Sequence, residues 1–357
     1  MSRFEKIIGG VATSGWRSDK HGRNAPTLVF LHGGIPGRTP YASGAHIWGA
    51  SLNQFATERN VLALDLPGAG GTGIPASGLT VDAITAHVRA SVDALGIDRC
   101  HLIGHDLGGL IALALASGQP DRIAAVSTVA CVSAAPSGDM IENRTFAYPP
   151  TPLWTRHSQA WALERISYSN HPIDDALLDA CVAAAAGAPH RAAQALMSSA
   201  TSADAFNMSL AQAKARFYET CRGAGLAMPV QVIWGSDDPL GTVDQALWLF
   251  RLVAARQPAT QFHLINRTGA LLFREDPAAF HQIVAAFADG IDAQFPSPRP
   301  FRIGASVSSD SLSRIRKGSL GRQTQRIRRS DISPPKPCTR ATTSNVCACR
   351  RRPASDR

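Results

Sequence analysis

The sequence has no apolar run that approaches the length of about 18 residues needed for a membrane-spanning helix. Its first residues, MSRFEKIIGG, lack the apolar segment and small-residue cleavage site of a secretory signal. Seven cysteines are scattered along the chain, and none has the C-x-x-C spacing of a metal site or the density of a disulfide framework. These absences favour a cytoplasmic protein with reduced thiols, no membrane association and no metal.

The formal net charge is +9, but most of the chain has little net charge of either sign. Residues 296–357 carry a net +12, whereas the first 295 residues carry a net −3. This basic tail is rich in arginine, serine and proline and poor in large apolar residues, a composition that predicts disorder. A non-native extension of the reading frame explains it better than a nucleic-acid partner does, so we expect no specific nucleic-acid binding.

Short, continuously apolar runs bounded by glycine or proline predict buried strands of a parallel sheet. Helix-like stretches alternate with them, which is typical of an α/β protein with right-handed crossovers. The predicted fold class is therefore α/β, with a mostly parallel central sheet and helices on both faces. The expected strands are 27–34, 60–68, 100–109, 122–133, 229–238 and 260–266, and the expected helices are 81–96, 109–120, 243–256 and 277–291.

A stretch of about 95 residues interrupts this alternation and differs from it in amino-acid composition. It is rich in alanine, helical in pattern and contains several aromatic residues. We interpret it as an inserted helical cap, the alternative being additional helices that pack on the sheet. The predicted organisation is a first part of the core at 1–133, the cap at 134–227, a second part of the core at 228–295 and the basic tail at 296–357.

The segment GHDLGG (104–109) follows an apolar strand and runs directly into a predicted helix. A sharp strand-turn-helix needs small residues around the one that it displays, because that residue adopts a strained backbone conformation and its neighbours approach closely. The displayed residue is Asp106. As an aspartate at the start of a helix it could also be a helix cap, but its place in this motif indicates a nucleophile.

Five motifs in order resemble the α/β-hydrolase superfamily, over about residues 25 to 291. They are HGGIPG (32–37), LDLPGAGGTG (64–73), GHDLGG, WGSDDP (234–239) and GALLFREDPAAF (269–280). The resemblance implies that Asp106 attacks an electrophilic carbon and forms an ester intermediate. It implies an oxyanion hole made by the backbone N–H of Leu107 and one N–H from the turn Gly33, Gly34 and Ile35. Asp238 is similar to the acid that orients a catalytic histidine.

An aspartate at the elbow resembles the epoxide hydrolases and the haloalkane and haloacid dehalogenases. Leu107 counts against dehalogenases, which commonly place Trp or Arg beside the nucleophile to hold the halide. Epoxide hydrolases use tyrosines of the cap, and Tyr148, Tyr168 and Tyr218 are available. The long segment 32–48 instead resembles the oxyanion loop of the C–C hydrolases of aromatic meta-cleavage pathways, which carry serine at the elbow. The resemblance implies a small-molecule substrate and no metal or organic cofactor.

The last motif lacks its histidine. The superfamily commonly has G-H-x-x-x-x-E-x-P here, and Glu275 and Pro277 keep that register, so Ala270 occupies the histidine position. Other histidines that we considered as a replacement base are, in sequence order, His32, His105, His157, His171, His190, His263 and His281. We expect a hydrolase of small apolar electrophiles such as epoxides or esters, slowed by the missing base. The alternatives are a pseudoenzyme that only binds a ligand, and a C–C bond hydrolase.

Overall fold

The computed structural model describes residues 1–22, 26–136 and 143–294. Within these ranges, eight strands form one sheet in the order β1-β2-β4-β3-β5-β6-β7-β8. Along the run β4-β3-β5-β6-β7-β8, adjacent strands are parallel, as the apolar runs predicted. The strands are β1 (Ser2–Ile8), β2 (Val11–Ser18), β3 (Thr27–Leu31), β4 (Asn60–Leu64), β5 (Cys100–His105), β6 (Ile123–Val129), β7 (Val230–Gly235) and β8 (Gln261–Ile265).

The N-terminal hairpin of β1 and β2 was not predicted from the sequence. The two strands pair antiparallel, and β2 also pairs antiparallel with β4. Gly9 and Gly10 form the two-residue turn, and both have positive φ angles of 58° and 80°, which suits the right-handed twist of a hairpin. β1 is largely exposed and carries charged residues, so it lacks the apolar run that identified the parallel strands.

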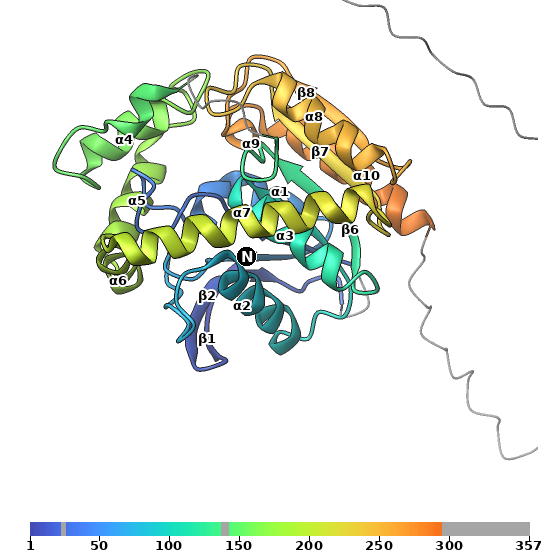
Figure 1. The fold of residues 1–357 in the computed structure, drawn as a ribbon, viewed down its shortest axis with the longest axis horizontal. Coiled ribbons are helices and arrows are strands. Elements are labelled where there is room, and N and C mark those ends of the chain that lie inside the picture. Colours follow the sequence, from blue (N-terminus) through green and yellow to red (C-terminus); the bar gives the residue numbers. More distant parts are fainter. Residues whose placement is uncertain (23–25, 137–142, 295–357) are drawn as a thin grey trace, which may run out of the picture. The chain divides into compact units, whose positions relative to one another are not determined.

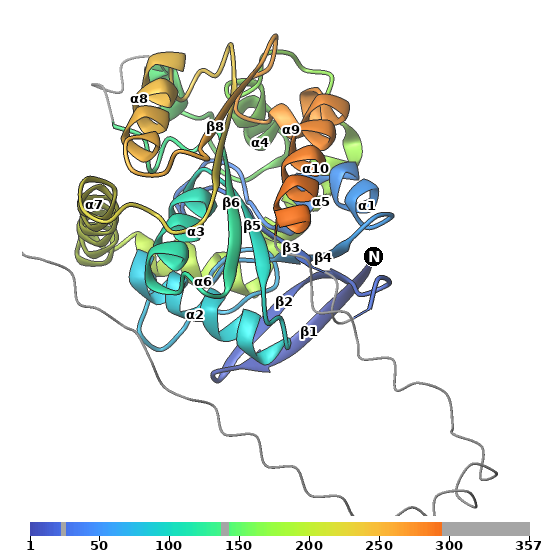
Figure 2. The same cartoon turned by 90° about the vertical axis from the view of Figure 1, so that its right-hand side faces the viewer.

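Helices cover both faces of the parallel strands (Figure 2). One face packs against α2, α3 and α8, and the other packs against α1 and α10. Alternate residues of β3 divide between the faces, because successive side chains of a strand point to opposite sides. The core helices are η1 (Ala45–Trp48), α1 (Ala50–Phe55), α2 (Val81–Ala94), α3 (Leu107–Gly118), α8 (Val243–Ala254), α9 (Leu272–Glu275) and α10 (Pro277–Gln294).

The described residues between β6 and β7 are mostly helical, and they include most of the predicted cap at 134–227. Thr155 and Asp174 begin two of its helices by accepting hydrogen bonds from backbone N–H groups of the first turn. The longest helix, α7, packs against α2 and α3 (Figure 1), and Arg216 of α7 pairs with Asp82 of α2. The helices are η2 (Arg144–Ala147), α4 (Arg156–Glu164), α5 (Asp175–Ala186), α6 (Ala188–Met197) and α7 (Ala200–Arg222).

The parallel sheet with helices on both faces confirms the predicted fold class, although several strands end earlier than expected. β3 ends at Leu31, and the rest of the predicted strand 27–34 is a loop. The domain boundaries stay a prediction, and the predicted tail 296–357 lies outside the described residues. In the part of the chain that the structure describes, every helix is too short or too polar to cross a membrane.

Candidate active site

Asp106 lies at a sharp turn between β5 and α3, where the sequence predicted an elbow. Its φ of 44° and ψ of −111° are outside the usual regions for a residue with a side chain. The flanking glycines are required by close approach: a Cβ at Gly104 would lie 2.3 Å from the carbonyl oxygen of Gly108, and a Cβ at Gly108 would lie 2.2 Å from that of Leu31. The surrounding backbone therefore determines the strained conformation of Asp106.

One oxygen of the Asp106 carboxylate is held by the loop after β6. The backbone N–H of Ser133 donates to Oδ1 at 3.1 Å, and the Ser133 hydroxyl donates to the same oxygen at 2.7 Å. The thiol of Cys131 donates to the Asp106 backbone carbonyl at 3.1 Å. Both of these side-chain hydrogen bonds go to Oδ1, which leaves Oδ2 as the candidate oxygen for attack.

The turn after β3 lies against the elbow, as an oxyanion loop requires. A Cβ at Gly33 would lie 2.9 Å from Cβ of Asp106. Gly34 has a φ of 88°, which favours glycine. The N–H of Ile35 donates to Oγ1 of Thr39 at 2.7 Å, so it already has an intramolecular partner. Leu107 is the first residue of α3, where a backbone N–H has no partner within the helix.

Asp238 lies in the loop after β7 and is only 8% exposed. Its Oδ1 accepts a hydrogen bond from the N–H of Leu240 at 2.8 Å, whereas Oδ2 is buried without a partner in the described structure. Burial, with the nearby charges of Asp106 and Glu275, raises the pKa of Asp238 to about 8. Asp238 therefore carries a proton over much of the neutral pH range, and one of its oxygens is unsatisfied.

Ala270 lies in the loop between β8 and α9 and is 1% exposed. Its N–H donates to the carbonyl of Ile166, at the end of α4, at 2.8 Å. Glu275 holds the same loop, since its Oε2 accepts from Gly269 N at 2.6 Å and its Oε1 accepts from Tyr168 N at 2.7 Å. The loop thus has ordered contacts on both sides of the position where the sequence lacks a histidine.

Within the described ranges, no histidine forms a hydrogen bond with Asp106 or Asp238. His32 binds the backbone around Gly33 and Leu66, and His171 binds the carbonyl of Glu275. His105 precedes Asp106, but its ring packs against Trp48 and Phe273, and burial lowers its pKa to about 4. Of the other candidates, His157 is exposed, the ring of His190 packs edge to face with Trp154, and His281 lies beside Glu58.

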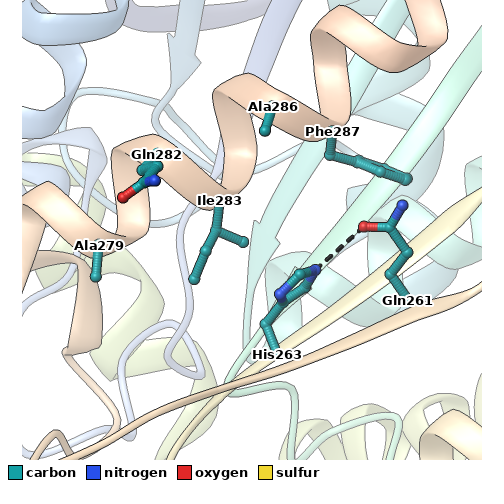
Figure 3. A pocket seen from close by; sticks show the side chains of 7 residues that line it. All are labelled: Gln261, His263, Ala279, Gln282, Ile283, Ala286 and Phe287. Atoms are coloured by element: carbon teal, nitrogen blue, oxygen red, sulfur yellow. Dashed lines mark hydrogen bonds between the residues drawn. The ribbon is translucent and has the colours of Figure 1, made fainter.

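His263 lies in a groove of about 440 Å³ between β8 and α10 (Figure 3). Its Nε2 contacts Oε1 of Gln261 at 3.1 Å, and the opposite wall is formed by the side chains of α10. Asp106, Asp238 and Ala270 do not line this groove. The groove therefore gives no support to His263 as the base of the candidate site.

Three residues near the carboxylates were not identified from the sequence. Ser133 holds Asp106, as described above. The Tyr41 phenol is buried, which raises its pKa above the ordinary value, and the charges of Asp106 and Asp238 add to this effect. Lys214, on α7, is half-buried, and burial lowers its pKa while the charge of Asp106 opposes that effect. Ser133 and Lys214 come from a loop and a helix without a spacing motif, so nothing in the sequence marked them. Tyr41 lies within the segment 32–48 that the sequence did mark, but no pattern distinguished the tyrosine itself.

The tyrosines considered for the cap do not supply a free phenol at the site. Tyr148 is 78% exposed and Tyr168 is 44% exposed. The Tyr218 hydroxyl donates to the carbonyl of Ala134 at 3.0 Å.

This arrangement is that of the alpha/beta hydrolase fold, whose family model matches residues 26–277. The chain belongs to this family, which confirms the resemblance drawn from the five motifs.

Among curated proteins, the chain is similar to the 2-hydroxy-6-oxononadienedioate/2-hydroxy-6-oxononatrienedioate hydrolase of Cupriavidus pinatubonensis, with 26% identity over 80% of this chain and 94% of that protein. It is 35% identical to epoxide hydrolase 4 of Mus musculus, over 28% of this chain and 27% of that protein. The chain spans only 26% to 31% of the first curated relatives that it matches.

Among solved structures, a variant of the meta-cleavage product hydrolase CumD from Pseudomonas fluorescens IP01 has the same fold. The TM-score is 0.65 at 19% identity, over 80% of this chain and 97% of that one.

Proposed function

We propose that the protein is a hydrolase that forms a covalent ester on Asp106 and releases it slowly. The observation that carries this proposal is the conformation of Asp106, a carboxylate held at a strained elbow by two hydrogen bonds to one oxygen. A residue in such a conformation persists only where the surrounding structure determines it, and such residues cluster at active sites. A simple helix cap needs no such strain, and the Asp106 side chain makes no capping hydrogen bond to α3.

In the proposed first step, Oδ2 of Asp106 bonds to an electrophilic carbon while the leaving group departs with the bonding electrons. In the second step, water adds to the ester carbonyl, whose oxygen is Oδ1, and the N–H and hydroxyl of Ser133 stabilise the oxyanion that develops there. The backbone N–H groups of Leu107 and Gly34 are the further donors that the family resemblance implies. Breakdown of this intermediate restores the carboxylate and releases an alcohol. An ester substrate would instead acylate Oδ2 and expel its alcohol in the first step, and water would then split the resulting anhydride into the Asp106 carboxylate and a carboxylic acid. Neither step needs a metal or an organic cofactor.

The second step is the slow one in this proposal. A general base contributes about 10²–10⁴-fold to such a rate, and Ala270 has no group that accepts a proton. The unpartnered Oδ2 of Asp238 supports this assignment, because it is an acid without the residue that it would orient. Its raised pKa agrees, since an imidazolium beside Asp238 would favour the charged carboxylate.

The proposed substrates are small, largely apolar molecules with an electrophilic carbon, such as epoxides or esters. The similarity to a protein named epoxide hydrolase 4 supports this class. Four cysteines, at positions 100, 131, 181 and 221, are buried and unpaired, which supports our proposal of a reducing compartment such as the cytoplasm.

Two other functions have a specific observation in their favour. Ligand binding without turnover is favoured by Ala270 and the unsatisfied Asp238. Hydrolysis of C–C bonds is favoured by the similarity to a hydrolase over 94% of its length.

The experiment that tests the proposal is intact-protein mass spectrometry after incubation with small epoxides, haloalkanes and activated esters. A stable added mass that is absent in Asp106→Asn is the expected result. Reversible binding with no adduct from any reagent would favour the ligand-binding function. Turnover of a C–C substrate that persists in Asp106→Asn would favour a C–C hydrolase with another nucleophile.

A further inference from the structure

The loop after β6 joins the nucleophile to the cap. Cys131 and Ser133 both bind Asp106, and the N–H groups of Ala134 and Ala135 bond to the carbonyl of Cys131. The loop is therefore a compact turn wrapped around the elbow. Any cap residue that contacts this turn is close to the reacting carboxylate.

Helix α7 is the part of the cap that contacts this turn. The Tyr218 hydroxyl donates to the carbonyl of Ala134 at 3.0 Å. The same helix packs on α3 (Figure 1), and α3 begins immediately after Asp106. Two independent contacts thus fix α7 beside the elbow.

Lys214 lies one helical turn before Tyr218, so the two side chains share a face of α7. The neighbouring Ala213 and Phe217 are buried, and Lys214 itself is half-buried. Because the Tyr218 hydroxyl reaches Ala134, this face of α7 lies toward the turn that holds Asp106, and Lys214 projects from the same face. Burial lowers the pKa of Lys214, and the charge of Asp106 opposes that effect.

We propose that Lys214 is a catalytic residue that protonates the leaving oxygen when Asp106 is alkylated by an epoxide. This proposal rests on the proposed function. As the Asp106 Oδ2–carbon bond forms, the ring carbon–oxygen bond breaks and its electron pair passes to the oxygen. That alkoxide takes a proton from the Lys214 ammonium, and the neutral amine regains a proton from solvent. The cap tyrosines do not fill this role, because two are exposed and the third donates to Ala134.

A pair of reagents with the same carbon skeleton separates proton donation from any structural role. The ring oxygen of 1,2-epoxyhexane needs a proton as it leaves, whereas the bromide of 1-bromohexane does not. Alkylation rates are measured by intact mass in the full chain, with the Asp106→Asn rate subtracted. The variants are Lys214→Met and, as a matched control, Arg216→Met, which removes an exposed cation of the same helix.

We expect Lys214→Met to slow alkylation by the epoxide about 100-fold, the size of a general-acid contribution, and to leave alkylation by the bromide within about threefold. Arg216→Met should change neither rate. An equal loss with both reagents, or no loss with either, would overturn the role of Lys214. If Tyr41→Phe slows alkylation by the epoxide alone and Lys214→Met does not, the proton donor is Tyr41 and not Lys214. If the parent protein forms no Asp106-dependent adduct with either reagent, the proposed function itself fails.

Discussion

Asp106 and Asp238 are the two carboxylates of the candidate site, and their surroundings differ. The close approach of the surrounding backbone constrains the conformation of Asp106. Its carboxylate accepts two hydrogen bonds from Ser133. Asp238 is held by the N–H of Leu240, with the N–H of Gly241 nearby, and its Oδ2 is buried without a partner in the described structure. We infer that the conformation of Asp106 is determined by the fold alone, whereas Asp238 lacks a partner that the alanine at position 270 cannot supply.

The largest effect on stability is expected from the elbow. Gly104→Ala forces a Cβ to within 2.3 Å of backbone, so we expect a loss of about 3 kcal/mol or more in the free energy of unfolding. Gly118→Ala, in α3 with open space around it, is the matched control, and it should gain up to about 1 kcal/mol. Urea denaturation measures both. Similar midpoints for the two variants would mean that the elbow is less tightly determined than its geometry indicates.

A smaller effect is expected at Asp238, and it depends on pH. The pKa of Asp238 is about 8 in the folded protein and about 3.9 in an unfolded chain. The folded state therefore holds the extra proton, and the stability that it contributes is lost as the pH rises through 8. Between pH 6.5 and 8.5, the free energy of unfolding of the parent protein should fall by about 2 kcal/mol. In Asp238→Asn this decrease should be absent.

The control for this measurement is Asp237→Asn, an exposed neighbour in the same loop. Below pH 6.5 the buried histidines dominate the pH dependence of stability, because burial lowers the pKa of His101 to about 3 and that of His105 to about 4. Their contribution to stability is complete above pH 6.5 and is lost as the pH falls. Thermal unfolding at a series of pH values separates the two ranges. A parent protein whose stability stays constant from pH 6.5 to 8.5 would argue against an unsatisfied Asp238.

The smallest effect is expected at Ser133. Ser133→Ala removes the hydroxyl that holds Oδ1 but keeps the backbone N–H, so the carboxylate samples other orientations. One hydrogen bond is worth about 1 kcal/mol, which corresponds to about fivefold slower formation of the adduct with epoxide and haloalkane alike. Ser133→Thr keeps the hydroxyl and should recover most of the rate. Slowing by Ser133→Thr as large as that by Ser133→Ala would indicate that packing, and not the hydrogen bond, is responsible.

The parallel strands were predictable because strands buried on both faces consist of apolar residues only. β1 was not, since its exposed positions carry Arg3, Glu5 and Lys6 and its pairing with β2 depends on a glycine turn. In the candidate site, Asp106, Asp238 and Ala270 occupy fixed places within motifs, and the sequence pointed to them on that ground. Ser133 and Lys214 approach Asp106 only through the folding of the loop after β6 and the packing of α7. Contacts of that kind leave no spacing in the sequence.

The central claim is that Asp106 reacts as a nucleophile but lacks a general base. The most direct test is the lifetime of the Asp106 adduct in the parent protein and in Ala270→His. Ala270→Asn is the control, since it adds a polar side chain of related size without a basic nitrogen. Adduct formation and decay are followed by rapid-quench mass spectrometry after one reagent equivalent. The account predicts that Ala270→His speeds decay by about 10²–10⁴-fold, leaves formation within about threefold, and that Ala270→Asn speeds neither. Rapid decay in the parent protein, unchanged by Ala270→His, would contradict it, because another base would then already be at work.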